Sequence, residues 1–471
     1  MLRAIFILYF IILSSLAYGQ SDTLIANEYF RKADSLSKAV QYDSSIYYFQ
    51  KASVIYEKTA HSLRIVSSSF WAKYVTCYRK IAWQYIQKAK FSKAIEYLET
   101  GLAAGLEKLG KEHPAVARCY YAFGAVYDYK GEYDRAFEYH QQALNIKIKT
   151  LGKNHSSVAS SYNYLGNLYR YTGDFDYAME HYQQSLRIWL KSLGKDHPYI
   201  AGSYLNIGII YQEKGDYYTA LEYYEQSLRI WLGTLGKDHP NVALSYNNMG
   251  NCYNDIGDHN KAMEFYQLSL KIRLNIFGND HYYVGRSYNN IGVTYWHKGD
   301  HDKAMEYYDR SLNIKFKSIG KNHPDVAVSY INMGGIYAVK GEFNKAKEYC
   351  NKSLKINLNT FGSYHPDVGE CYNALGYLYR KIAESFYPTK SGQAGDSAVT
   401  QYRKALGYYQ KAISSLVKNF VGNSIYVNPD LKKVFIPGKA PKIEGVQSMP
   451  VLLDTLEGKA ETFYEKWMMS P

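Results

Sequence analysis

The sequence predicts an all-α chain built as a solenoid of about nine helical hairpins. The first observation is a 42-residue period, because one histidine and two sets of glycines recur at that spacing along most of the chain. Repeat arrays have periods of about 20 to 50 residues. The second observation is a pair of apolar stripes with helical spacing in every unit. The third is glycine or proline where the two helices of a unit would begin and end.

The recurrent histidines each come just before the expected start of a unit's first helix. They are His113, His155, His197, His239, His281, His323 and His365. This position predicts a turn or capping role. Copies on neighbouring packed helices lie ~8 to 10 Å apart, too far to share one ion, and the sequence predicts no metal site.

The unit from Pro198 to Gly236 shows the helical stripes. The stripe of its first helix, helix A, comprises Ala201, Tyr204, Gly208 and Tyr211, and the stripe of its second helix, helix B, comprises Ala220, Tyr224, Leu228 and Trp231. Each set follows the spacing of one face of an α-helix. Every unit is therefore predicted to be a helical hairpin.

Residues between the helices agree with these boundaries. We expect Gly215 to adopt the left-handed conformation after helix A, and Asp216 to cap helix B. Gly236 is expected to end helix B in the same way as Gly215. Pro240 then falls in the first turn of the next helix A, where its missing N–H has no cost.

The number of units follows from the small residue that recurs at the Ala220 position. Its copies are Ser45, Ala94, Ala136, Ala178, Ala220, Ala262, Ala304, Ala346 and Ala405. The first interval is 49 residues and the last is 59, whereas the others are 42. The last insertion, from Pro388 to Gly395, is predicted to be a loop between lengthened helices. Atypical ends are expected where a solenoid faces water.

The segment 235–253, LGKDHPNVALSYNNMGNCY, resembles the 42-residue tetratricopeptide repeats of kinesin light chains. The resemblance implies a right-handed superhelical solenoid of tetratricopeptide hairpins, with helix A lining the concave surface. It implies a scaffold for protein–protein interaction, with a peptide or protein ligand held in the concave groove. It implies no enzyme activity and no cofactor.

The N-terminus predicts a signal peptide over residues 1–19. Arg3 precedes an apolar run from Ala4 to Leu16, and Ala17-Tyr18-Gly19 forms a small-x-small cleavage site. The apolar run is shorter than the roughly 20 residues that cross a bilayer. We expect a secreted or periplasmic protein with no membrane insertion after cleavage, and a solenoid over residues 20–420.

Residues 421–471 are predicted to form a loop and a C-terminal docking helix. The helix is expected between Met449 and Trp467, with an apolar face of Leu452, Leu456, Ala460 and Phe463. This arrangement is similar to the junction between repeats and the caspase-like CHAT protease domain of secreted bacterial proteins. The resemblance implies an alternative function, as the regulatory or substrate-recognition arm of a CHAT protease system whose catalytic domain is missing from this chain.

Composition argues against several other functions. The net charge is +13, but it is concentrated near the C-terminal end and no recognition motif accompanies it, so nucleic-acid binding is not expected. Five scattered cysteines favour free thiols in the core over a disulfide framework. The sequence contains no phosphate-binding loop, zinc-protease helix or nucleophile elbow. We therefore predict no catalytic residues; the sequence leaves the oligomeric state open.

The candidate binding residues form an asparagine ladder on helix A. One repeat position holds Asn206, Asn248, Asn290 and Asn332, and the position before it holds Asn163, Asn247, Asn289 and Asn373. Asn206 is turned by about 200° from the apolar stripe, so these amides should face the groove. Asparagine is a poor residue inside a helix. A carboxamide can, however, donate to and accept from a peptide backbone at once.

Two alternatives remain for the ladder. The amides either hold a peptide backbone, as similar asparagines do in the kinesin-light-chain groove, or bond to each other between adjacent A helices. Ligand specificity would come from residues beside the ladder, namely Asn167, Arg170, Asn251, Asn254, Trp296 and Arg380. Arg170 and Arg380 suit acidic side chains, and Trp296 offers an apolar anchor.

Overall fold

The computed structural model describes residues 22–62, 67–386, 396–416 and 455–462. The secondary structure of these residues is α-helix and short turns, without a strand. The predicted signal peptide, the loop from Pro388 to Gly395 and most of residues 421–471 lie outside the described residues. None of the described helices is both long enough and apolar enough to cross a membrane.

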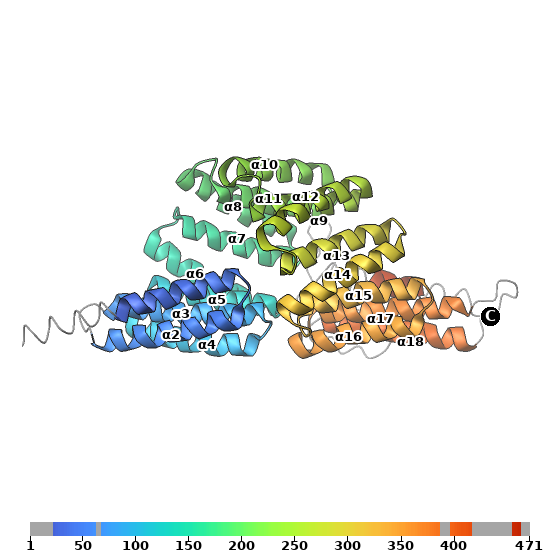
Figure 1. Ribbon diagram of the computed structural model, residues 1–471, viewed down its shortest axis with the longest axis horizontal. Coiled ribbons are helices and arrows are strands. Elements are labelled where there is room, and N and C mark those ends of the chain that lie inside the picture. The colour runs from blue at the N-terminus through green and yellow to red at the C-terminus, as the bar shows by residue number, and fades with distance from the viewer. Residues whose placement is uncertain (1–21, 63–66, 387–395, 417–454, 463–471) are drawn as a thin grey trace, which may run out of the picture. The chain divides into compact units, whose positions relative to one another are not determined.

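The described helices alternate between the two types predicted from the stripes (Figure 1). A helix at 22–38 begins the series, and the later A helices are α3 (Ser67–Gln87), α5 (Pro114–Tyr129), α7 (Ser156–Tyr171), α9 (Pro198–Glu213), α11 (Pro240–Ile256), α13 (Tyr282–His297), α15 (Pro324–Val339) and α17 (Pro366–Ser385). The B helices are α2 (Tyr42–Ser62), α4 (Phe91–Leu109), α6 (Tyr133–Leu151), α8 (Phe175–Leu193), α10 (Tyr217–Leu235), α12 (His259–Phe277), α14 (His301–Ile319), α16 (Phe343–Phe361) and α18 (Asp396–Leu416). The described residues thus contain nine hairpins, and all nine residues at the Ala220 position are fully buried.

The chain divides into two compact units, residues 1–161 and 162–471. In the first unit each helix from α2 to α6 packs on the next, and in the second unit the same holds from α8 to α18. Successive A helices also contact each other in several places, as α15 and α17 do. Each hairpin therefore packs mainly on its sequence neighbours, which confirms the predicted all-α repeat array.

Backbone geometry confirms most of the predicted helix ends. All seven recurrent histidines cap a helix A, with Nδ1 accepting a hydrogen bond from the backbone N–H two residues later at 3.1 to 3.2 Å. Asp216 caps α10 through Thr219 N, and Gly215 has a φ of 80°. Gly236 differs from the prediction, because its φ of 81° is combined with a ψ of 163°. This extended conformation with positive φ is essentially restricted to glycine.

A glycine of helix A lets the two helices of a hairpin approach closely. A Cβ on Gly208 would lie 2.7 Å from the ring of Tyr224 and 3.1 Å from the carbonyl oxygen of Ala220. Equivalent rings lie against Gly166, Gly250, Gly292 and Gly376. Tyr224 is fully buried, so its ring has no free space into which it could move.

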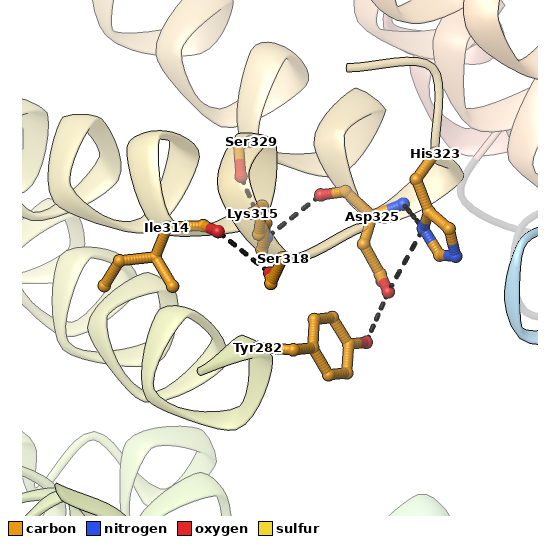
Figure 2. Close-up of polar contacts among 7 residues, drawn as sticks. All are labelled: Tyr282, Ile314, Lys315, Ser318, His323, Asp325 and Ser329. Carbon is orange, nitrogen blue, oxygen red and sulfur yellow. Dashed lines mark hydrogen bonds and ion pairs between the residues drawn. The ribbon is translucent and has the colours of Figure 1, made fainter. Parts of the chain in front are cut away.

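Consecutive hairpins are joined by a buried donor on helix B. Figure 2 shows the example of Lys315, whose Nζ donates at 2.9 Å to both the carbonyl oxygen of Asp325 and the hydroxyl of Ser329 on α15. The same residue spacing recurs in other repeats. There the donors are Lys147 to Ser157 O and Ser161 Oγ, Arg273 to Tyr283 O and Ser287 Oγ, and Asn357 to Asp367 O and Cys371 Sγ. These contacts, which the sequence patterns did not predict, position the next helix A on the preceding helix B in these four repeats.

All five cysteines are free and buried, as predicted. Burial raises the pKa of the Cys119 thiol to about 12, which makes it unreactive at neutral pH. The thiols therefore act as small core residues.

The described part of the predicted C-terminal helix spans residues 455–462. Its buried residues are Thr455, Lys459 and Thr462, whereas Leu456 is half-buried and Ala460 is exposed. The docking face is therefore not the predicted stripe of Leu452, Leu456, Ala460 and Phe463; Leu452 and Phe463 themselves lie outside the described residues. Lys459 donates to Gln410 Oε1 of α18 at 2.6 Å, so a polar contact determines the docking face.

We predict opposite effects for two glycine-to-alanine substitutions in α9. Gly208→Ala forces a methyl group into the Tyr224 ring and should lower the unfolding free energy by about 1 to 3 kcal/mol. Gly202→Ala has open space around its Cβ and should raise the unfolding free energy by about 0.5 to 1 kcal/mol through helix propensity. Urea denaturation followed by circular dichroism measures both; equal effects would contradict the close-approach argument.

The buried lysine predicts a pH dependence of stability. Burial lowers the pKa of Lys315 to about 8 from an ordinary 10.5. Above pH 8 the unfolded chain therefore binds more protons than the folded chain, so this group makes folding more favourable as pH rises. From pH 8 to 9 the wild-type chain should gain about 1 kcal/mol relative to Lys315→Met.

The control for this prediction is Lys317→Met, because Lys317 is exposed on the same helix and pairs with Asp280. Its stability should follow the wild type between pH 8 and 9. A Lys315→Met variant that also follows the wild type over this range would show that Lys315 keeps its proton.

Candidate binding groove

The surface of the second unit formed by its A helices holds two adjoining pockets. One has a volume of about 310 Å³ and is lined by Gln212, Asn251, Asn254, Asp255, Tyr266, Asn290, Val293 and His297. The other has a volume of about 640 Å³ and extends from α13 to α17 and the helix 455–462. Val293 and His297 line both pockets. We call the two together the helix-A groove.

Three of the predicted ladder residues, Asn290, Asn332 and Asn373, line the helix-A groove, and several ladder residues bond to each other. Asn206 donates to Asn163 at 2.8 Å, Asn290 to Asn247 at 3.0 Å, and Asn332 to Asn289 at 3.4 Å. Each pair joins one helix A to the next at a spacing of 43 residues, one more than the period. The structure thus contains the inter-repeat amide bonds that the sequence left as one of two alternatives.

The other ladder residues have different environments. Asn247 is 7% exposed and also accepts from Arg273, so it belongs to the joint between hairpins. Asn248 is half-buried. Asn373 lines the larger pocket, and its Oδ1 is buried without a hydrogen-bond partner among the described residues.

Both predicted arginines are already paired within the chain. Arg170 binds Glu213 on α9 at 2.6 Å, and Arg380 binds Glu461 of the helix 455–462. The two arginines occupy the same repeat position, so the helix 455–462 contacts α17 as the next helix A would. Burial raises the pKa of Glu213, and Arg170 opposes that shift. Neither guanidinium is left for an acidic side chain of a ligand without breaking an internal ion pair.

Tyrosines of the hairpin core supply polar contacts to the groove. The hydroxyl of Tyr182 donates to Asn167 Oδ1 at 2.6 Å, and that of Tyr266 donates to Asn251 Oδ1 at 2.7 Å. Tyr224 donates to Gln212, whose amide donates in turn to Asp255 at 2.6 Å. The sequence pattern missed these links, although the constant spacing of 15 residues between Tyr182 and Asn167 and between Tyr266 and Asn251 was available to find two of them.

The titratable groups of the smaller pocket include Asp255 and His297. Burial raises the pKa of Asp255, against the effect of its bond from Gln212. Burial also lowers the pKa of His297, whose ring stacks on His259 with centroids 5.6 Å apart. Asn254 contacts His259 Nδ1 at 3.0 Å. This pocket therefore presents amides, a carboxylate and the imidazole of His297.

Trp296 lies in the larger pocket, half-buried, with its ring 4.9 Å from that of His301. His297, on α13, stacks on His259 instead, so His297 and His301 contact different groups. The described residues contain no group of three or more His, Cys, Asp or Glu side chains placed to hold a metal ion.

The amide pairs predict unequal effects of two alanine substitutions. Asn290→Ala removes the bond to Asn247 and should lower the unfolding free energy by about 1 kcal/mol, less a few tenths for the better helix former. Asn248→Ala breaks no described hydrogen bond and should raise the unfolding free energy by up to about 0.7 kcal/mol. Chemical denaturation of both variants decides; a stabilised Asn290→Ala would show that the pair contributes nothing to the array.

No curated protein matches the chain significantly. Among solved structures, BtubC (BKLC) from P. vanneervenii is 25% identical with a TM-score of 0.39, covering 50% of this chain and 92% of that one. A putative kinesin light chain of Podosopora anserina with nearly identical TPR-like repeats is 27% identical with a TM-score of 0.36, covering 43% and 95%. A Rap protein complexed with Competence and Sporulation Factor shares the fold at 13% identity, with a TM-score of 0.53 and coverage of 84% and 99%.

The family assignment rests on a match to the Tetratricopeptide repeat model. The matched residues are 78–149, 129–191, 157–217, 199–275, 257–315 and 317–385. The match gives no indication of a catalytic family, and the resemblance to a CHAT junction stays a hypothesis about residues that lie mostly outside the described ones. With nine described hairpins in the same register, the chain belongs to the tetratricopeptide repeat family, whose fold is that of a protein–protein interaction scaffold.

Proposed function

We propose that this protein is an extracytoplasmic scaffold that binds a partner polypeptide along the helix-A groove. The observation that carries the proposal is a set of half-buried carboxamides on successive A helices that line the two adjoining pockets. They are Asn251, Asn254, Asn290, Asn332 and Asn373. The extracytoplasmic location rests on the signal features of residues 1–19.

The paired amides keep hydrogen-bonding capacity for a ligand. When Asn290 donates one N–H to Asn247, its second N–H and its own Oδ1 remain for another partner. Successive packed helices repeat at ~8 to 10 Å, which corresponds to about three residues of extended chain at ~3.3 Å each. A backbone lying across the A helices would thus meet an amide about every third residue.

Internal pairing also makes the amides better binding groups. Amides fixed by one bond lose less conformational freedom when a ligand arrives, so more of the interaction energy contributes to affinity. The tyrosine hydroxyls on Asn167 and Asn251 fix those side chains in the same way. The two alternatives for the ladder are therefore compatible, because one carboxamide can join two repeats and still bind a peptide.

Among chains that share the fold, the Rap protein was crystallised with Competence and Sporulation Factor. That complex is a property of the Rap protein. At 13% identity, the likeness between the Rap protein and this chain shows a shared fold only. It is nevertheless consistent with a repeat array of this length holding a ligand.

The test is peptide selection against the purified chain from residue 20, followed by fluorescence polarisation with the selected peptides. Val293 lies between the two pockets, so Val293→Trp should obstruct both and weaken peptide binding at least tenfold. The matched control is Tyr218→Ala, because Tyr218 is 76% exposed on a B helix and should not affect affinity. Circular dichroism must show equal helicity in all three proteins.

Two results would contradict this proposal. Peptides that bind wild type and Val293→Trp equally well would place the binding site away from the groove. If no peptide is selected above the background of an unrelated helical protein, the chain does not bind peptides and the proposal is wrong.

A further inference from the structure

The larger pocket occurs where the repeat pattern changes inside the array. The residue four positions after each unit's counting residue fills the space between helices A and B. These residues are Phe49, Leu98, His140, Tyr182, Tyr224, Tyr266, Tyr308, Cys350 and Tyr409, and all of them are buried. Cys350 is the smallest of the nine. It faces Gly334 as the tyrosines of other repeats face their glycines.

The amide that would bind a tyrosine hydroxyl is missing from the same repeat. Fifteen residues before Tyr182 and Tyr266 are Asn167 and Asn251, and each accepts the hydroxyl. Fifteen residues before Cys350 is Gly335. Both partners of the ring and amide pair are therefore replaced by small residues, and both line the 640 Å³ cavity.

The walls of the cavity suit an aromatic ring. Trp296 and Tyr377 line it from α13 and α17, and Tyr308 and Tyr409, the equivalents of Cys350 in the adjoining repeats, line it as well. Aromatic pairs of this kind add favourable energy beyond the area that they bury. The cavity thus lies beside the position that a tyrosine holds in other repeats, and aromatic side chains line it.

A polar group in the cavity favours an aromatic ring that carries a hydroxyl group. The terminal amide atom of Asn373, assigned as Oδ1, is buried and has no hydrogen-bond partner among the described residues. Oxygen and nitrogen of a carboxamide are interchangeable in such assignments. A phenol both donates and accepts, so it satisfies this atom in either orientation, whereas an indole N–H donates only. Glu457, Glu461 and Arg380 also line the cavity; Arg380 pairs with Glu461, and the charge of Glu457 disfavours an anionic ring substituent.

We propose that this cavity, bounded by Cys350, Gly335 and Asn373, binds the tyrosine side chain of the partner polypeptide. The proposal rests on the proposed function, which supplies the partner polypeptide. The position of the ring is inferred from the equivalent residues of the other repeats. The bound ring fills space beside Cys350 in the cavity, with its hydroxyl at Asn373.

The first test uses p-cresol, which is the tyrosine side chain without a backbone, and saturation-transfer NMR. Wild type should bind p-cresol, and should bind toluene about fivefold more weakly because toluene lacks the hydroxyl. It should bind 4-methylbenzoate more weakly still. Absence of p-cresol binding, or toluene binding as strong as p-cresol binding, would overturn the proposal.

A variant that restores the repeat pattern should fill the cavity. Cys350→Tyr with Gly335→Asn reproduces the pairs of Tyr182 with Asn167 and of Tyr266 with Asn251, and a Cβ on Gly335 meets only Trp296, at 3.9 Å. This double variant should keep its helicity and bind p-cresol at least tenfold more weakly. His140→Tyr is the control, because it introduces a tyrosine at the equivalent position in a repeat of the first unit and should leave p-cresol binding unchanged.

Asn373→Leu keeps the test decisive if the double variant does not fold. It should bring p-cresol binding down to the level of toluene without changing toluene binding. Unchanged discrimination between the two ligands in Asn373→Leu would show that the amide does not recognise the hydroxyl.

Selected peptides separate this proposal from the proposed function. Replacing their tyrosine with phenylalanine should weaken binding about fivefold to wild type and not at all to the double variant. Peptides that bind the groove without this tyrosine dependence would leave the scaffold function intact and overturn the tyrosine site. Binding of p-cresol without selection of any peptide would overturn the assignment to a partner polypeptide.

Discussion

The close approach of the two helices within a hairpin is the constraint on which the rest of the structure depends. A glycine such as Gly208 brings the backbone of helix A against the ring of Tyr224. The ring then extends beneath helix A, and its hydroxyl reaches Gln212 on the groove side. One packing requirement in the core therefore decides which amides of the groove are held in place. Core and binding surface cannot be varied independently in this array.

The second constraint is the joint between hairpins. A buried donor such as Lys315 spans from helix B to the carbonyl of Asp325 and to Ser329, near the start of the next helix A. This fixes the offset between successive A helices, and the amide pairs, such as Asn290 with Asn247, follow from that offset. Burying a lysine is costly unless its donors are satisfied. Stability and the spacing of the ladder are thus determined by the same contacts.

These two constraints explain how far the sequence could predict the structure. Period, helix number and histidine caps were predictable because each is local and recurs many times. The amide pairing stayed one of two alternatives, because it depends on the 43-residue register, which follows from the packing offset between A helices. The docking face of the helix 455–462 was missed for a related reason. The prediction placed the most hydrophobic residues on the docking face, whereas Lys459 is buried there with its ammonium donating a hydrogen bond to Gln410. The tyrosine links to Asn167 and Asn251 needed two positions to be compared together along the array.

A repeat array also changes what an irregular residue signifies. Each hairpin must satisfy the same packing rule, so Cys350 leaves a cavity that lowers the stability of its own repeat. Because stability in a solenoid is close to a sum over neighbouring repeats, the adjoining hairpins can offset that local deficit. The helix 455–462 contributes here as well, since Arg380 binds Glu461 at the edge of the cavity. The array therefore tolerates one incompletely packed hairpin, flanked by tyrosines and closed at one side by a docked helix. A partner that supplies the missing ring would restore the packing of that hairpin, so binding at this position stabilises the folded array by the same interaction that holds the other repeats together.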